Sequence, residues 1–277
     1  MMLATQRWKT MIEEEHAQSE RIRGAVPPPD DHWRPYAQQF RADPRRTDDS
    51  LVNRLLQEVT PDHTVLDVGA GGGRLALPLA LRCRHLVAVE PSSSMCAVLR
   101  QQVSECSIRN VSVVEAHWEE AEVDAADVVL CAHVMYVVSG IERFVRKLET
   151  HARERVLVLL YQARPQSQLH PLWKRVHGEE RLPLPSLPEF EEVLSELGID
   201  AHVELLPPQP ARGFDDQEQA LEQLGRRLYL APDSRQMAAL EGMLPDLLEE
   251  MDGGFAIRGA KLREPGLVWW QPQRAPR

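Results

Sequence analysis

Residues 63–91 read HTVLDVGAGGGRLALPLALRCRHLVAVEP, and no other part of the chain constrains the architecture as strongly. An apolar run at 63–69 leads directly into the glycine-rich segment 69–73. A segment rich in leucine and alanine follows at 74–81, and a second apolar run occupies 85–91. Strands that are apolar at nearly every position are typical of parallel sheets covered by helices on both faces. The stretch therefore predicts two parallel strands joined by a glycine loop and a right-handed helical crossover.

The same alternation continues to Tyr161. Further strands are expected at 111–116, 127–132 and 155–161, with helices at 93–107 and 140–151 between them. Two later apolar runs, AHVELLPP at 201–208 and GLVWWQP at 266–272, complete the set. The pattern predicts an α/β fold, doubly wound around a mostly parallel seven-stranded sheet.

The remaining segments are expected to be helical additions to this core. Residues 1–60 form a predicted helical cap, 61–162 the core, and 163–277 a helical insert plus the last two strands. The predicted helices at 1–23, 33–40, 189–197, 215–228 and 233–251 would form a lid, with a cap at 47–50 starting one more. A length of 277 residues suits one domain with such appendages.

Composition narrows the classes of partner. The formal net charge is −10, and the basic clusters at 41–46 and 143–147 are interleaved with acids, so a nucleic-acid substrate is unlikely. No apolar run is long enough to cross a bilayer, and the N-terminus lacks the layout of a secretory signal. Four cysteines without a C-x-x-C pair predict neither a disulfide framework nor a metal site. We expect a cytoplasmic monomer or homodimer with no metal.

The glycine loop indicates a bound ligand. Glycines are needed where φ is positive and where a ligand lies against the backbone. Dinucleotide-binding domains use G-x-G-x-x-G here, but Arg74 replaces the third glycine. Asp67 would repel a pyrophosphate, and Glu90, at the end of the second strand, can accept hydrogen bonds from ribose hydroxyls. These residues favour a nucleoside with an amino or sulfonium group and disfavour a nicotinamide dehydrogenase.

VLDVGAGGGRLALPLA at 65–80, followed by LVAVEPSSSM at 86–95, resembles the first two motifs of class I S-adenosylmethionine-dependent methyltransferases. The resemblance covers residues 63–161. It implies a Rossmann-like fold, S-adenosylmethionine as cofactor and S-adenosylhomocysteine as product. It also implies that Glu90 holds the ribose, that Pro91 and Met95 border the ribose or adenine, and that the methionine end is held by Asp67, Gly69, Ala70, Gly71 and Gly73.

The third motif of that family departs from its usual form. In place of Gly-Asp-Ala the chain has Ala116-His117-Trp118-Glu119. If the alignment holds, His117 takes the place of the acid near the adenine amino group. Trp118 either packs on the purine or offers it a backbone N–H, or else it merely covers the edge of the sheet.

The residues at the end of the fourth strand are expected to face the reacting methyl group. We assign Cys131 and Ala132 to the cofactor site. His133 is the candidate general base, and Tyr136 would orient the acceptor or contact the methionine carboxylate. The alternative for both is a purely structural role.

These residues also bear on the methyl acceptor. The D/N-P-P-Y/F motif of amino methylation and the Pro-Cys pair of pyrimidine C5 methylation are absent. We expect in-line transfer to an O, N or C nucleophile of a small organic acceptor in an apolar pocket. A methyltransferase acting on protein or RNA, and a non-catalytic binder of S-adenosylmethionine or S-adenosylhomocysteine, remain alternatives.

Overall fold

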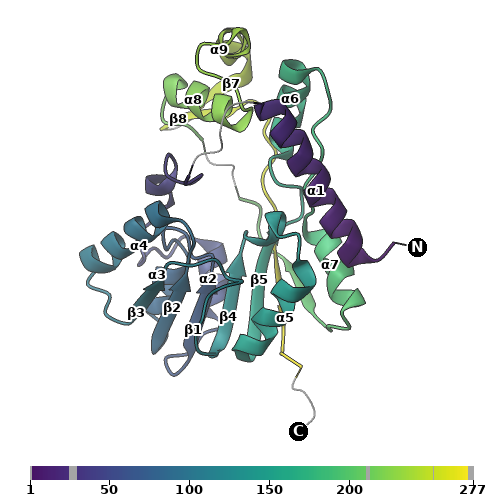
Figure 1. Ribbon diagram of the computed structural model, residues 1–277. Coiled ribbons are helices and arrows are strands. Elements are labelled where there is room, and N and C mark those ends of the chain that lie inside the picture. Colours follow the sequence, from purple (N-terminus) through teal and green to yellow (C-terminus); the bar gives the residue numbers. More distant parts are fainter. Residues whose placement is uncertain (1, 25–29, 210–212, 252, 274–277) are drawn as a thin grey trace.

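The computed structural model describes residues 2–24, 30–209, 213–251 and 253–273 (Figure 1). Its main sheet has seven strands in the order β3-β2-β1-β4-β5-β9-β6. Their bounds are β1 Thr64–Val68, β2 His85–Val89, β3 Val111–Val114, β4 Ala126–Ala132, β5 Ala152–Tyr161, β6 His202–Leu205 and β9 Pro265–Trp270. The first five strands are parallel, whereas β9 runs antiparallel to both β5 and β6. The predicted doubly wound, mostly parallel seven-stranded sheet is confirmed.

Helices cover both faces of this sheet, as the apolar strands require. One face packs against α2 (Ser50–Leu56), α3 (Ala76–Ala80) and α4 (Ser93–Glu105). The other packs against α1 (Ala4–Arg23), α5 (Ile141–His151) and α7 (Leu187–Glu196). Alternate strand residues serve the two faces: Leu157 and Leu159 of β5 belong to the first cluster, Val156 and Val158 to the second. Two apolar cores thus sandwich one sheet.

The adjacent tryptophans of β9 show the same alternation. Trp270 is buried and its indole N–H donates to Glu149 of α5. Trp269 turns to the opposite face, where its ring stacks on His202 at 4.1 Å between centroids. Neighbouring positions of the strand thus point to opposite faces of the sheet.

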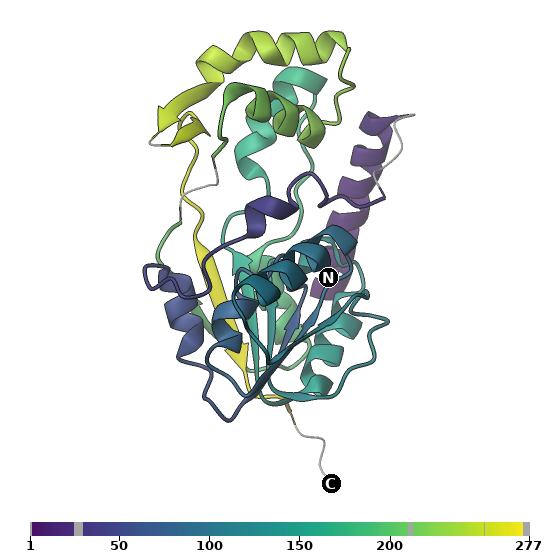
Figure 2. The ribbon, with the colours of Figure 1, turned by 90° about the vertical axis from the view of Figure 1, so that its left-hand side faces the viewer.

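A helical lobe stands over the carboxyl-terminal edge of the sheet (Figures 1 and 2). It contains α6 (His170–His177), α8 (Gln217–Arg227), α9 (Arg235–Leu247) and the hairpin of β7 (Leu248–Met251) and β8 (Gly254–Ile257). These elements share an apolar cluster that is distinct from the two cores of the sheet. The first helix, α1, extends from the flank of the sheet up to this lobe (Figure 1).

The structure corrects three element predictions. The segment expected to be helical at 33–40 forms only a short 3-10 helix, η1, at Ala37–Phe40. The helix expected at 233–251 ends at Leu247, because residues 248–251 pair with β8 as a strand. Finally, α6 at His170–His177 is not among the predicted helices. By contrast, the cap expected at 47–50 is confirmed, since the Asp49 side chain accepts a hydrogen bond from Val52 N–H at the start of α2.

Candidate active site

The order of the strands fixes where a ligand can bind. The chain turns from β1 towards β2 on one side and reaches β4 on the other, so the crevice between the ends of β1 and β4 is the topological switch point of the sheet. Ligands of doubly wound folds bind outside the carboxyl ends of the strands at this point. The loop 69–73 follows β1 and residues 133–136 follow β4. The predicted cofactor and methyl-facing residues therefore meet at one place.

Three glycines shape the loop. Gly69, Gly71 and Gly73 have φ of 75°, 55° and 90°, values that a residue with a Cβ rarely adopts. A Cβ on Gly69 would lie 2.2 Å from Cγ2 of Val134, so the loop touches the segment after β4. A Cβ on Gly71 would meet nothing within 4 Å. Gly71 thus presents bare backbone to open space, as a cradle for a ligand requires.

Asp67 is a buried carboxylate without a partner. Its side chain is 2% exposed at the end of β1, and no described residue donates a hydrogen bond to it. Burial, and then the nearby charge of Glu90, raise the pKa of Asp67 to about 7. A buried ionised group without a partner is unfavourable, so this position is suited to a ligand that supplies positive charge.

Two hydrogen bonds hold the Glu90 carboxylate against the glycine loop and the start of α4. Its two carboxylate oxygens accept hydrogen bonds from Gly71 N–H at 2.8 Å and from Ser92 N–H at 2.9 Å. Burial raises the pKa of Glu90, although both hydrogen bonds work in the opposite direction. The carboxylate is therefore fixed in orientation beside the open space at Gly71.

Asp31 lies beside the candidate site, and the sequence analysis did not predict it. It accepts hydrogen bonds from the Ser92 hydroxyl at 2.9 Å and from Ser94 N–H at 3.0 Å, which ties the N-terminal segment to the start of α4. Burial raises the pKa of Asp31, but these hydrogen bonds outweigh it and hold the pKa at about 2. Nothing in the local pattern around position 31 links it to a serine more than sixty residues away.

The residues predicted to surround the adenine are spread more widely. Pro91 and His117 are exposed, and His117 is close enough to lower the pKa of Glu90 electrostatically. Met95 is buried between α4 and η1 with Val98 and Ala37. These positions border the crevice on the β2 and β3 side.

Trp118 points away from this crevice. Its ring lies under Lys147 Nζ at 4.6 Å and against His151 at 5.0 Å, both on α5. The indole is 3% exposed and Nε1 has no hydrogen-bond partner among the described residues. Of the roles considered for Trp118, this packing favours covering the sheet over stacking on a purine.

The segment after β4 forms a compact polar cluster. His133 Nδ1 lies 3.0 Å from the Tyr136 hydroxyl, which also accepts a hydrogen bond from Tyr161 N–H at 2.7 Å. The His133 ring stacks on the Tyr161 ring at 4.1 Å between centroids. His133 has φ of 59°, a left-handed conformation that is rare for a residue with a side chain and is often found at functional sites. No described residue bonds to its Nε2.

Burial governs protonation in this cluster. Burial, with a smaller effect of the positive charges of Arg74 and Arg263, lowers the pKa of His133 to about 3. His133 is therefore neutral at pH 7. Burial raises the pKa of Tyr136 and of Cys131 well above their usual ranges. Cys131 stays a buried thiol in β4, and Ala132 ends that strand beside it.

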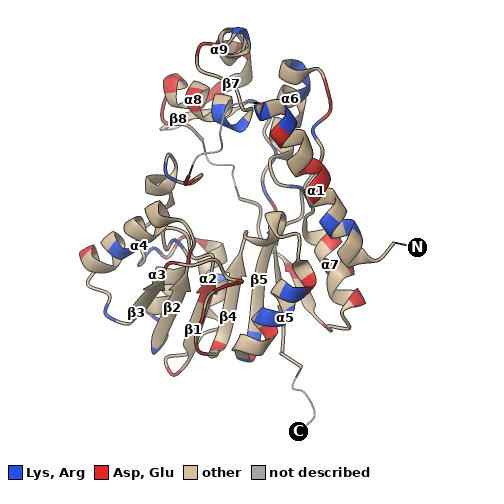
Figure 3. Cartoon of the chain, in the orientation of Figure 1, with Lys and Arg blue, Asp and Glu red and all other residues tan. Residues whose placement is uncertain are grey.

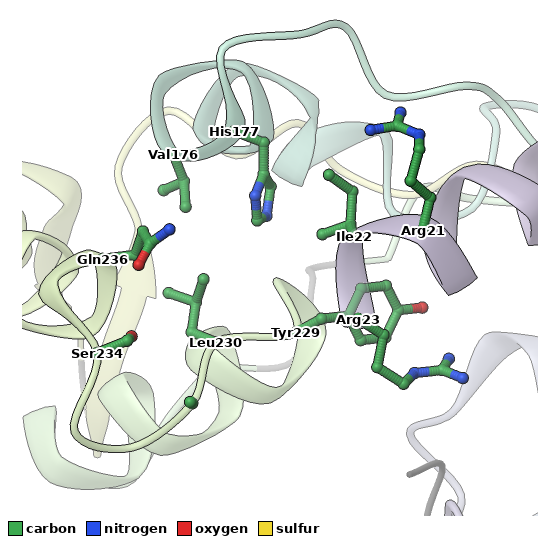
Figure 4. Close-up of a pocket in the computed structure, with 10 residues that line it drawn as sticks. Arg21, Ile22, Arg23, Val176, His177, Tyr229, Leu230, Ser234 and Gln236 are labelled. Atoms are coloured by element: carbon green, nitrogen blue, oxygen red, sulfur yellow. The ribbon is translucent and has the colours of Figure 1, made fainter. Parts of the chain in front are cut away.

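A cavity of about 430 Å³ lies elsewhere, in the helical lobe between the end of α1, α6 and residues 229–236 (Figure 4). Arg23, His177 and Tyr229 line it. No residue of the glycine loop reaches it, so it is not the cofactor crevice. Within the described part of the chain, no group of His, Cys, Asp and Glu side chains could hold a metal ion. Among the same residues, no helix combines the length and hydropathy needed to cross a membrane.

Comparisons with known proteins agree with this geometry. Residues 65–155 match the model of a family described as a methyltransferase domain. A probable ribosomal RNA small subunit methyltransferase A from Methanosphaera stadtmanae is 29% identical over 70 residues, or 24% of this chain and 26% of the relative. A ubiquinone biosynthesis O-methyltransferase from Rickettsia prowazekii is 30% identical over 97 residues, or 35% and 38%. The chain thus spans well under half the length of these curated relatives.

Solved structures extend the likeness of fold beyond the matched segment. The YcgJ protein of Bacillus subtilis aligns with a TM-score of 0.53 and 16% identity, covering 81% of this chain and 98% of that one. A methyltransferase from Geobacter sulfurreducens, solved with S-adenosyl-L-homocysteine, aligns with a TM-score of 0.50 and 16% identity, covering 83% and 92%. Residues 65–155 thus resemble a methyltransferase domain, and the solved structures extend the likeness of fold over most of the chain.

Proposed function

We propose that this protein is an S-adenosylmethionine-dependent methyltransferase that acts on a small organic acceptor. The observation that carries the proposal is the unpartnered, buried carboxylate of Asp67 beside a glycine loop at the switch point of the sheet. The ammonium group at the methionine end of the cofactor would supply the positively charged partner that Asp67 lacks.

The residues present fit the cofactor at three points. Asp67 would bind the ammonium group, and the open backbone at Gly71 leaves room for the chain of the ligand. Glu90, fixed by Gly71 and Ser92, would accept hydrogen bonds from the ribose hydroxyls. A dinucleotide is a poorer fit, because a pyrophosphate would lie against these two carboxylates.

The bound cofactor would supply an electrophilic methyl group on a sulfonium. The residues of this chain would position the acceptor and receive a proton from it. His133 is neutral at pH 7, has no partner at Nε2 among the described residues, and is the candidate to receive the proton that the nucleophile loses. Because its pKa is about 3, it is a weak base and would take up the proton only once methylation has made the acceptor strongly acidic. Tyr136 and the stacked Tyr161 hold the imidazole in place. Transfer then depends mainly on alignment in a site that excludes water.

An RNA acceptor is the second candidate, because one relative is named as a ribosomal RNA methyltransferase. That match covers 24% of this chain, a share too small to carry over an acceptor. In the view of Figure 3, several helices carry both acidic and basic residues, and the formal net charge of the chain is −10. A small acceptor is therefore favoured. Binding of structured RNA that weakens steeply with salt would reverse this choice.

The test is calorimetric titration of the full chain with S-adenosylmethionine, S-adenosylhomocysteine and NAD. We expect the first two to bind and NAD not to bind. The variants Asp67→Asn and Glu90→Gln should each weaken cofactor binding by about tenfold or more, since a hydrogen bond to a charged group contributes about 1.5–3 kcal/mol. Glu120→Gln, at an exposed position outside the crevice, is the control. Unaltered affinity in both site variants would refute the assignment of the site.

A further inference from the structure

Two arginines of the upper part of the molecule carry charges that no carboxylate neutralises. Arg227 is the last residue of α8, and Arg263 lies just before β9. Both side chains are partly buried. Among the described residues, neither guanidinium has a carboxylate within the 4.0 Å of an ion pair.

Aromatic rings take the place of the missing carboxylates. The Arg227 guanidinium lies 5.8 Å from the centroid of the Tyr36 ring, and its charge acts to lower the pKa of the Tyr36 hydroxyl against the larger, opposite effect of burial. The guanidinium of Arg263 lies 5.5 Å from the centroid of the Tyr161 ring. Cation-π contacts of this kind stabilise a guanidinium but leave its charge in place.

One of the two charges, that of Arg263, lies beside the residues that are predicted to face the methyl group. Tyr161, under Arg263, stacks on His133, and Arg263 is close enough to lower the pKa of that histidine. Burial lowers the pKa of Arg227, and Arg263 is close enough for its positive charge to lower that pKa further. Two like charges are therefore near one another, with Arg263 over the ring that stacks on His133.

The nearby acids are already engaged. Asp31 accepts hydrogen bonds from Ser92 and Ser94. Glu222, the acid closest to Tyr36 on α8, pairs with Arg226 at 2.6 Å. Asp49 pairs with Arg74 and Arg46, each at 3.0 Å. Among the described residues, none of these acids forms an ion pair with Arg227 or Arg263.

Holding two partly desolvated cations together is unfavourable unless an anion joins them. Guanidinium groups bind carboxylates and phosphates through paired hydrogen bonds. We propose that the methyl acceptor carries a carboxylate or phosphate group, which Arg227 and Arg263 bind from above while its nucleophile lies beside His133. The assignment of this anion as the acceptor rests on the proposed function.

The test uses the full chain and simple aromatic probes, since Tyr36, Tyr161 and His133 offer rings for stacking. Benzoate, phenyl phosphate and the neutral benzamide are titrated by calorimetry, with and without saturating S-adenosylhomocysteine. Benzoate and phenyl phosphate distinguish the two sources of negative charge. The variants are Arg227→Gln, Arg263→Gln and the double variant, with Arg227→Lys to keep the charge. Arg235→Gln, exposed at the start of α9, is the matched control.

We expect at least one anion to bind about tenfold more tightly than benzamide, and each glutamine variant to weaken it about tenfold, a loss of about 1.4 kcal/mol. The lysine variant should retain part of the affinity and Arg235→Gln all of it. Anions that bind no better than benzamide, or equally well to the double variant, would overturn the proposal. Failure of S-adenosylhomocysteine to bind, with the anion result intact, would overturn the proposed function and leave the anion site standing.

Discussion

Asp67 combines a cost to the free protein with a proposed role in binding. The pKa of Asp67 is raised from 3.8 to about 7 by burial and by Glu90. A carboxyl whose folded pKa lies above its unfolded value stabilises the fold below the unfolded pKa, and this contribution is lost as the pH rises through the folded pKa. Residues that are unfavourable for stability and central to binding are typical of functional sites.

We therefore predict opposite effects of Asp67→Asn on stability and on binding. At pH 8 the ligand-free variant should be more stable than the wild type in urea unfolding, by about 1.4 kcal/mol for each unit of the pKa shift at most. At pH 4 the two should be alike. In the same preparation, affinity for S-adenosylhomocysteine should fall. A variant that is less stable at pH 8 than the wild type would contradict this account of the carboxylate.

Binding should also release a proton. At pH 7 about half of the Asp67 carboxyls are protonated, and a cationic ligand would lower their pKa, so about 0.5 proton should leave per ligand bound. Calorimetry in two buffers of different ionisation enthalpy measures this number. Asp67→Asn should abolish the release, and affinity in the wild type should weaken as the pH falls below about 7. Buffer-independent binding enthalpies in the wild type would be inconsistent with this proton release.

The glycines of the loop separate packing from binding. Gly69→Ala places a Cβ 2.2 Å from Val134, whereas Gly71→Ala meets no atom within 4 Å. Both pay about 1–2 kcal/mol for positive φ, and Gly69→Ala adds about 1–3 kcal/mol of overpacking. We expect Gly69→Ala to lose more stability in urea unfolding, and Gly71→Ala to lose mainly cofactor affinity because its methyl group fills the cradle. Equal effects of the two on both measurements would argue against an open cradle at Gly71.

At the scale of single residues, some residues of the candidate site could be predicted from the sequence and others could not. Asp67, the glycines and Glu90 follow β1 and β2 within 23 residues, and their roles depend on local turns that leave a pattern. Asp31, Arg227 and Arg263 contact Ser92, Tyr36 and Tyr161, respectively, each from a segment far away in the chain. Their positions follow from long-range packing, which a single sequence does not display. Trp118 is the opposite case. Its position in the third motif suggested a contact with the ligand, whereas its ring packs against Lys147 of α5.

At the scale of elements, the helical lid depends on how α1 is docked. Arg181, between α6 and α7, pairs with Glu15 of α1, and both side chains are 6% exposed. The Arg181 guanidinium also lies 3.9 Å from the ring centroid of Trp173 on α6. One buried pair therefore joins the first helix to the segment that precedes α7.

Removing one member of this pair should loosen α1. Arg181→Ala leaves Glu15 buried without its partner, and we expect a loss of about 3–5 kcal/mol in urea unfolding. Arg21→Ala, which removes an exposed pair with Glu179 at 2.8 Å, should cost about 0–1 kcal/mol. The double variant Glu15→Met with Arg181→Met should recover much of the loss. A double variant as unstable as Arg181→Ala would indicate that packing on Trp173, and not the ion pair, holds the helix.

The sequence predicted the elements of the core better than those of the lobe. The core strands are apolar on both faces and are bounded by glycine, acid or proline. The sequence therefore predicts both that these segments are strands and where they lie. The run at 235–251 stays leucine- and acid-rich throughout, and helix gives way to strand only because β8 returns to pair with residues 248–251. That pairing, like the contact of α6 with α8, is a tertiary contact, which the local sequence pattern does not reveal.

At the scale of the whole molecule, sheet and lobe have separate apolar cores. The cofactor residues belong to the sheet, whereas Arg227 belongs to the lobe. The two parts should therefore respond differently to damage. Mutations within the lobe are expected to affect the acceptor side of the site and to leave cofactor binding largely intact.

Leu240→Ala and Leu157→Ala form a matched pair for this prediction. Both leucines are 0% exposed, Leu240 in the cluster of the lobe and Leu157 in the sheet. Each should cost about 2–5 kcal/mol locally. Hydrogen exchange of Leu240→Ala should accelerate in α8, α9 and the β7–β8 hairpin while the amides of β1 and β4 stay protected. Affinity for S-adenosylhomocysteine should change by less than about threefold in Leu240→Ala, or about 0.6 kcal/mol, and fall further in Leu157→Ala. Uniform acceleration across the sheet in Leu240→Ala would instead mean that lobe and core unfold as one cooperative unit, and that the acceptor and cofactor sides of the site cannot be loosened separately.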